Sequence, residues 1–224
     1  MNTISHCARC KIPKNERICQ CQDGKGPKFC PTLNFADLVS TVTSEYQAPE
    51  FKTFAKLASI QEAECYAHRA AGPYVLQPEK CRIQETMEFA TKIGAKKLGL
   101  AFCGGLHREA EMLCDVLETR GFEVFSVCCN AGGVPKESIG ISENQKVYVG
   151  EYETMCNPLF QAEVLNQAGT DFNIVLGLCV GHDSLFFKKT KAMCTVLAAK
   201  DRVTGHNPLA ALYTLHSYYR KLKN

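Results

Sequence analysis

Two short apolar segments flank a helical pattern in the middle of the chain, with glycines at the junctions. The apolar segments cover 97–103 and 122–128, and the helical pattern between them runs over 106–120 and stops at Gly121. Strand, glycine turn, helix and strand in this order form a βαβ unit. Such a unit requires parallel strand pairing and a right-handed crossover.

The same alternation continues downstream. A helical pattern over 158–167 leads into an apolar strand at 173–179, and a fourth strand at 194–200 precedes a closing helix at about 209–222. Strands that are apolar on both faces belong inside a sheet covered by helices. The sequence therefore predicts an α/β fold with a doubly wound, mainly parallel, Rossmann-like sheet.

Upstream of this sheet, the sequence predicts a helical lead-in and a small N-terminal module. Apolar residues recur at helical spacing over 35–71, with a break at Ala48-Pro49, and again over 79–93. Residues before this region show almost no apolar periodicity. The expected parts are a cysteine-rich metal-binding module at 1–34 and an α/β domain at 35–224, made of the lead-in (35–94) and the Rossmann-like sheet (95–224).

The charges are balanced, which excludes several classes of partner. The 26 basic and 23 acidic residues give a net charge of +3, without the basic surface typical of nucleic-acid-binding proteins. No apolar run approaches the length of a membrane span, and the first residues lack the apolar core of a secretory signal. We therefore expect a cytoplasmic protein that binds neither nucleic acid nor membranes.

Cysteine is unusually frequent, with 14 in 224 residues. In a reducing cytosol such cysteines indicate metal or redox chemistry rather than a disulfide scaffold. Exposed thiolates in air oxidise up a ladder whose later steps are irreversible, so the composition also suits an anaerobic source.

Five of the cysteines lie in the N-terminal module. Cys7 and Cys10 form a Cys-x2-Cys pair, and Cys19, Cys21 and Cys30 follow. Four thiolates suit zinc or a 4Fe-4S cluster, and the Cys-Pro pair at Cys30 favours iron–sulfur slightly. We predict Cys7, Cys10, Cys19 and Cys30 as metal ligands, with Cys21 as the alternative. Free surface thiols are the competing interpretation, but without metal this segment has nothing to order it.

A second set of cysteines lies at the predicted strand ends. Cys103 follows the first strand, Cys128 and Cys129 the second and Cys179 the third, and Cys156 lies in a loop before a helix. Open parallel sheets bind ligands at the carboxyl ends of their strands. We therefore predict that Cys103, Cys128, Cys156 and Cys179 line a site for a soft metal or an iron–sulfur cluster.

Ordinary burial is the alternative, because free cysteine packs as a small apolar residue. That interpretation is preferred for the cysteines inside helices or at a strand start, which are Cys65, Cys81, Cys114 and Cys194.

Polar residues accompany the strand-end cysteines. His182 and His206 each follow a glycine in a predicted loop after a strand, where a histidine transfers protons or supports a ligand. A purely structural role is the alternative for both. If the site works through a thiol, Cys179 is the predicted nucleophile, with His182 three residues on. Residues 200–202, Lys-Asp-Arg, follow the fourth strand.

Several segments together resemble an uncharacterised metal-binding family. The motifs that carry the resemblance are Cys7-Ala-Arg-Cys10, Cys30-Pro31-Thr32, Met155-Cys156-Asn157-Pro158 and Gly177-Leu178-Cys179-Val180-Gly181-His182-Asp183. The resemblance continues into 200–208 and so covers nearly the whole chain. It implies metal binding and a mainly anaerobic distribution among bacteria and archaea, and it implies no particular reaction.

The leading hypothesis is a metal-binding protein, with iron–sulfur or zinc, whose strand-end site performs redox or ligand chemistry on a small molecule or with an electron-transfer partner. Two alternatives stay open. One is a non-enzymatic metal sensor or carrier, and the other is a thiol-based enzyme with Cys179 as nucleophile. The sequence leaves the metal, the substrate and the oligomeric state open.

Overall fold

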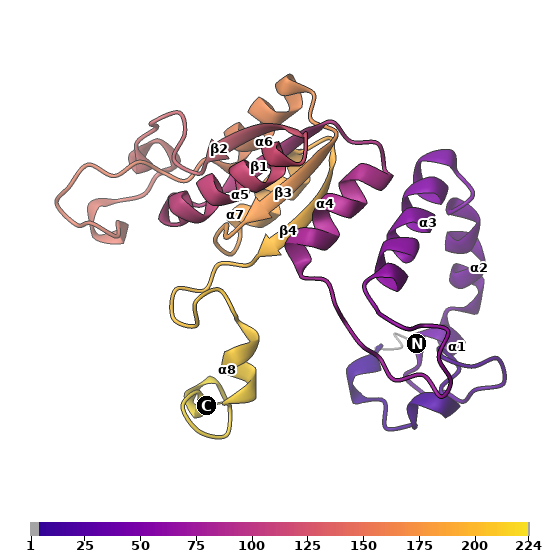
Figure 1. The fold of residues 1–224 in the computed structure, drawn as a ribbon. Helices are drawn as coiled ribbons and strands as arrows, with labels where there is room; N and C mark the ends of the chain where they lie inside the picture. The colour runs from indigo at the N-terminus through magenta and orange to yellow at the C-terminus, as the bar shows by residue number, and fades with distance from the viewer. Residues whose placement is uncertain (1–4, 224) are drawn as a thin grey trace. The chain divides into compact units, whose positions relative to one another are not determined.

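A computed structural model describes residues 5–223 of the chain, which divides into two compact units at Ile60/Gln61 (Figure 1). The first unit contains α1 (Pro31–Asn34), α2 (Ala36–Glu45) and most of α3 (Pro49–Glu64). The sequence analysis assigned α2 and α3 to the lead-in of the main domain instead.

The predicted break before Pro49 is present, and α3 starts there with Glu50 in its first turn. A proline at the start of a helix loses no hydrogen bond, and an acidic first turn suits the helix dipole. The helix ends at Glu64, seven residues before the expected 71. Beyond this end, His68 has φ of +52°, which an α-helix does not allow, so the helix could not have continued to 71.

The second unit contains a four-stranded sheet in which every neighbouring pair is parallel (Figure 1). The strand order is β2-β1-β3-β4. The strands are β1 (Lys97–Phe102), β2 (Glu123–Cys128), β3 (Phe172–Leu176) and β4 (Met193–Ala198), and the helices of this unit are α4 (Arg82–Lys92), α5 (His107–Thr119), α6 (Pro158–Ala168), α7 (His182–Lys189) and α8 (Leu209–Tyr213). The predicted α/β fold with a doubly wound parallel sheet is thereby confirmed.

Helices cover both faces of this sheet. On one face, Phe89 of α4 packs edge-on against Phe172 of β3, and α5 places His107 beside Phe102 of β1. On the other face, the alternate strand residues Ala101 and Val175 pack in a buried cluster with residues of α6 and α7. The core therefore lies on both sides of β1 and β3, which accounts for their continuous apolar sequences.

Local sequence signals set the ends of α6. Asn157 caps the helix by accepting a hydrogen bond from the amide of Phe160 at 3.1 Å, and Pro158 occupies the first turn. Gly169 ends the helix with φ of +66°. These signals fix the position of Cys156, which directly precedes the cap.

Two sequence-based assignments after β3 were wrong. The third strand stops at Leu176 rather than 179, because Gly177 takes φ of +66° and turns the chain. The segment that was read as a loop at His182 forms α7.

The expected closing helix over 209–222 was also wrong in length. It is limited to α8, five residues long, followed by turns and a short 3-10 helix at Arg220–Lys223. Within residues 5–223, no helix has the length and apolar character needed to cross a bilayer.

Gln161 ties α6 to the carboxyl ends of two strands. Its amide nitrogen donates to the carbonyl oxygens of Phe102 at 3.2 Å and Val127 at 2.7 Å, and the side chain is fully buried. These carbonyls belong to β1 and β2, immediately before the strand-end cysteines. A buried amide of this kind fixes the strand ends relative to the helix.

Replacing Gln161 by Leu should lower the free energy of unfolding by about 1–2 kcal/mol, because a buried strand carbonyl loses its partner. The measurement is urea denaturation followed by circular dichroism. Gln167→Leu on the same helix is the matched control, since Gln167 is exposed and should change stability by about 0.5 kcal/mol or less. Equal stability of the two variants would contradict this role of Gln161.

Candidate functional site

The carboxyl ends of the strands meet at one edge of the sheet, where the chain reverses its winding. From β1 the chain passes through α5 to β2 on one side, and it then returns through α6 to β3 on the other side of β1 (Figure 1). Such a switch point leaves a crevice between the connections, which is where open α/β sheets bind ligands. Cys103 follows β1 here, and the segment after β3 brings in Cys179.

Three thiols at this edge form a series in space, in which Cys129 lies between Cys103 and Cys156. Cys103 and Cys129 share a side-chain hydrogen bond, and the sulfurs of Cys129 and Cys156 are 3.7 Å apart. The backbone amide of Gly104 donates to the Cys129 sulfur at 3.3 Å. Cys103 and Cys129 are buried and Cys156 is half-buried, so the three thiols form one partly enclosed cluster.

Cys179 and two cations border this cluster. The Arg202 guanidinium donates to the Cys179 sulfur at 3.0 Å, and the Lys200 ammonium hydrogen-bonds to Cys103. Charge on Cys179 raises the pKa of Cys156, so the two sulfurs lie within electrostatic range. We call Cys103, Cys129, Cys156 and Cys179 the rim cysteines.

The pKa values of the cluster differ among its members. The hydrogen bond to Cys129, together with burial, raises the pKa of Cys103 to about 12. The hydrogen bond with Cys103 lowers the pKa of Cys129, but the hydrogen bond with Cys156 and burial outweigh it and raise the pKa to about 11. The hydrogen bond with Cys129 lowers the pKa of Cys156. Of these three thiols, Cys156 is therefore the one whose thiolate the surroundings favour.

The structure brings Cys129 into the cluster, whereas the sequence analysis chose Cys128 for this position. Cys128 is the last residue of β2 and pairs in register with Phe102. Successive strand residues face opposite sides of a sheet. Cys103 and Cys129, each one residue further on, therefore share the side covered by α6. Counting this alternation along the predicted strands would have pointed to Cys129.

The two predicted histidines lie near the edge, and among the described residues neither imidazole ring hydrogen-bonds to the Cys179 sulfur; the His182 backbone amide donates to the Cys179 carbonyl at 3.0 Å. His182 starts α7, and its Nδ1 is buried without a partner in the described part of the chain. His206 accepts a hydrogen bond at Nδ1 from the amide of Asp201 at 3.1 Å. This contact, with the His206 amide donating to the Asp201 carbonyl at 2.9 Å, closes the loop that carries Arg202; the predicted catalytic role of His206 stays a prediction.

Arg202 is a site residue that the sequence analysis named without assigning a role. Its loop is held by Asp201, whose carboxylate accepts from the amides of Val203 and Thr204 at 2.9 Å each. The hydrogen bond to Cys179 raises the pKa of Arg202. The sequence could have predicted that Arg202 lies at the site, because Arg202 follows β4 and that strand also ends at the site edge.

Of the four cysteines interpreted as ordinary buried residues, Cys65 is buried and Cys114 and Cys194 are half-buried, whereas Cys81 is exposed, which contradicts that interpretation for Cys81. Burial raises the pKa of Cys65, Cys114 and Cys194, which keeps these thiols protonated and unreactive. Cys194 lies at the start of β4, the end of the strand opposite to the site edge.

In the N-terminal unit, a 3-10 turn at Cys7–Arg9 brings the Cys10 amide to the Cys7 carbonyl at 3.1 Å. The amides of Leu33 and Thr32 hydrogen-bond to Cys30 and lower its pKa, with burial opposing them.

All fourteen cysteines lie within the described residues and are free thiols. In residues 5–223, no three His, Cys, Asp or Glu side chains already stand in metal-ligating geometry. The N-terminal ligand set, including Cys19 or Cys21, therefore stays a prediction.

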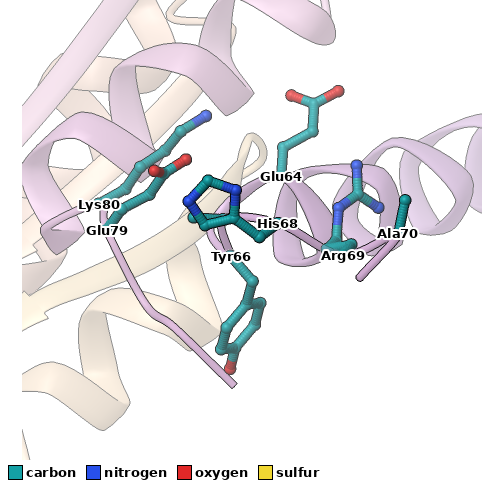
Figure 2. Close-up of a pocket in the computed structure, with 8 residues that line it drawn as sticks. Glu64, Tyr66, His68, Arg69, Ala70, Glu79 and Lys80 are labelled. Atoms are coloured by element: carbon teal, nitrogen blue, oxygen red, sulfur yellow. The ribbon is translucent and has the colours of Figure 1, made fainter. Parts of the chain in front are cut away.

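A separate hollow of about 890 Å³ lies in the second unit, lined by residues from the segments 64–70 and 79–80 (Figure 2). Figure 2 shows Glu64, His68 and Lys80 beside this hollow. Glu64 and Lys80 are already paired with Lys92 and Glu88, each at 2.7 Å. No cysteine is among its lining residues, so the hollow is distinct from the rim cysteines.

Comparison with known proteins places the chain beside others of undetermined activity. Residues 30–197 match a family described as "Protein of unknown function (DUF1847)". An uncharacterised protein of Methanocaldococcus jannaschii is 38% identical over 216 residues, which is 96% of this chain and 97% of that protein. These matches agree with the resemblance to an uncharacterised family with an archaeal member.

Two crystal structures of Dph2 from Pyrococcus horikoshii, one of them with a 4Fe-4S cluster, are similar to this chain. The TM-score is 0.35 and the sequence identity 19% in both cases. The similarity covers 65% of this chain and 33% of Dph2, so the chain spans about a third of that protein's length.

The pKa order of the cluster predicts selective reactivity. In metal-free protein, Cys156 should be alkylated by iodoacetamide at lower pH than Cys103 or Cys129, because only thiolates react. Replacing Cys129 by Ala removes the hydrogen bond that favours the Cys156 thiolate, so the Cys156 profile should move to higher pH. Mass spectrometry of peptides labelled across a pH series measures this. Cys194→Ala is the control, and a Cys156 profile that is the same in both variants would contradict the assignment.

Proposed function

We propose that this chain, which belongs to the family described as protein of unknown function (DUF1847), is a metal-binding protein whose rim cysteines hold a soft metal. The contact series of Cys103, Cys129 and Cys156 carries the proposal. Thiolates are the ligands that soft metals prefer. Three cysteines from two connections of one sheet, with Cys179 from the connection after β3 as the fourth, supply four thiolate donors.

The charges around the cluster suit a bound dication. Four thiolates around a divalent ion leave two excess negative charges, and burying such charge is costly unless it is compensated. Lys200 and Arg202 provide two positive charges next to Cys103 and Cys179. The same balance applies to a 4Fe-4S cluster whose core carries two positive charges.

The spacing of the sulfurs favours a single ion such as zinc. Thiolates about 2.3 Å from zinc in tetrahedral geometry stand about 3.8 Å apart, and the sulfurs of Cys129 and Cys156 are 3.7 Å apart. An iron–sulfur cluster is the second candidate. Bound zinc supplies a Lewis acid, whereas a bound cluster supplies one-electron transfer.

A carrier or sensor role is supported by Cys179. Its sulfur already accepts a hydrogen bond from Arg202, so Cys179 is the one of the four ligands whose release would open a position on the metal. Open positions are typical of sites that exchange ligands, whereas structural zinc sites are closed. We therefore place exchange of the metal or of a bound small molecule at Cys179. A reducing compartment such as the cytoplasm suits this role.

The N-terminal cysteines form a second proposed site. Cys7, Cys10, Cys19 and Cys30, with Cys21 as the alternative to Cys19, lie in a segment whose residues are mostly exposed. Such a segment gains little from apolar burial, and metal ligation would supply the missing stability. This site would be structural or an electron relay.

Metal content of the full chain, purified without air, tests the proposal. Cys129→Ser combined with Cys156→Ser should remove about one equivalent of metal per chain, because two ligands are lost. Cys7→Ser with Cys10→Ser should remove the N-terminal metal and leave the rim metal. Elemental analysis with a visible spectrum measures both and separates zinc from iron–sulfur.

Cys114→Ser with Cys194→Ser is the matched control, since both residues lie outside the cluster and should leave metal content unchanged. Metal content that stays constant in the Cys129/Cys156 variant, or that falls as far in the control, would refute the rim site.

A further inference from the structure

Two of the rim cysteines are held in a position suited to a second chemistry. The sulfurs of Cys129 and Cys156 are 3.7 Å apart, and a disulfide requires about 2.05 Å. The amide of Asn157 donates to the Cys129 carbonyl at 2.6 Å, which holds the two backbone segments side by side. The sulfurs must therefore approach by about 1.7 Å to bond. We propose that Cys129 and Cys156 form a redox-active dithiol that oxidises to a disulfide when no metal is bound.

The intervening chain is clamped at its base, which keeps the pair together. Between β2 and α6 the chain makes a long excursion, and its two arms form the isolated bridge Pro135–Thr154. The Met155 amide donates to the Val134 carbonyl at 2.8 Å. An ion pair of Lys136 with Glu153 at 2.6 Å lies on the same arms. The approach of Cys156 to Cys129 is thus built into the fold.

Exposure distinguishes the roles of the two thiols. Cys156 is half-buried, whereas Cys129 is 4% exposed. An oxidant arriving from solvent therefore meets Cys156 first, and Cys129 stands behind it as the resolving thiol. Cys103 also contacts Cys129, but both of these sulfurs are buried, so this pair lacks an accessible member. Cys179 is engaged by Arg202.

The reaction partner is a low-molecular-weight disulfide. The Cys156 thiolate attacks one sulfur of that disulfide, forms a mixed disulfide and releases one small thiolate. The Cys129 thiolate then attacks the Cys156 sulfur, forms the internal disulfide and releases the second small thiolate. The two protein thiols are oxidised by two electrons, the small disulfide is reduced to two thiols, and the two protein protons pass to the released thiolates.

Disulfide formation and metal binding exclude each other, and this part of the inference rests on the proposed function. The disulfide removes two of the four proposed ligands, so an oxidised chain lacks a rim metal site. A bound metal in turn occupies both sulfurs and protects them from exchange. The site would then release metal in response to an oxidising thiol pool and take it up again after reduction.

The experiment uses the full chain, stripped of metal with a chelator without air and equilibrated in mixtures of reduced and oxidised glutathione. Free thiols are blocked with N-ethylmaleimide, and tryptic peptides are analysed by mass spectrometry. The first internal disulfide should join peptide 121–136 to peptide 147–188, which contain Cys128 with Cys129 and Cys156 with Cys179. Fragmentation of the linked peptides assigns the individual sulfurs.

Cysteine variants identify the two linked sulfurs without relying on peptide fragmentation. Cys128→Ser with Cys179→Ser should keep the link, because Cys129 and Cys156 are then the only cysteines in the two peptides. Cys156→Ser, at a half-buried position, should abolish it, and circular dichroism checks that this variant is folded. A first disulfide at another pair, or a link that persists in Cys156→Ser, would overturn the inference.

A second arm loads the wild-type chain with zinc before the same glutathione titration. The link should then require a more oxidising mixture, and zinc should appear in solution as the link forms, detected with a colorimetric chelator. If the loaded chain forms the link as readily as the stripped chain while keeping its zinc, mutual exclusion is wrong. If the chain binds no metal, the proposed function fails. The disulfide mapping on the metal-free chain still shows whether Cys129 and Cys156 form a redox-active pair.

Discussion

The parallel alignment of β1 with β2 and β3 is the constraint on which the site depends. Parallel strands end at the same edge, so the residues after each strand converge there even though they are far apart in the sequence. Cys103 and Cys129 reach the edge in this way. The amino-terminal end of α6 adds Cys156, which Asn157 fixes by capping the helix. The thiol cluster is therefore a product of topology and requires no dedicated metal-binding loop.

Proximity of thiols has an electrostatic consequence. In the metal-free chain, Cys103 and Cys129 hold their protons because burial and shared hydrogen bonds disfavour a second negative charge. A metal must displace these protons, so its affinity should weaken as pH falls. Lys200 and Arg202 offset part of the remaining charge. The same arrangement that prepares a ligand set also leaves one reactive thiolate, which links metal binding to thiol chemistry at one place.

The sequence predicted the four strands and their order along the chain because the apolar segments and glycine stops are local signals, although β3 ends three residues earlier than expected. It missed α7 because His182 directly follows Gly181 and begins a short polar stretch, His182-Asp183-Ser184, and both features also fit a loop. It chose Cys128 over Cys129 because the face on which each cysteine lies depends on which residue of the first strand pairs with it. The structure pairs Cys128 with Phe102, so Cys129 lies on the same face as Cys103. The contact of Arg202 with Cys179 joins residues from separate loops, and no local pattern predicts such a contact.

X-ray absorption at the metal edge tests the central claim most directly. The sample is the Cys7→Ser/Cys10→Ser chain loaded with zinc, so that signal comes from the rim cysteines. The account predicts a first shell of three or four sulfur atoms at about 2.3 Å. A first shell made of nitrogen and oxygen at about 2.0–2.1 Å, with no sulfur, would contradict it.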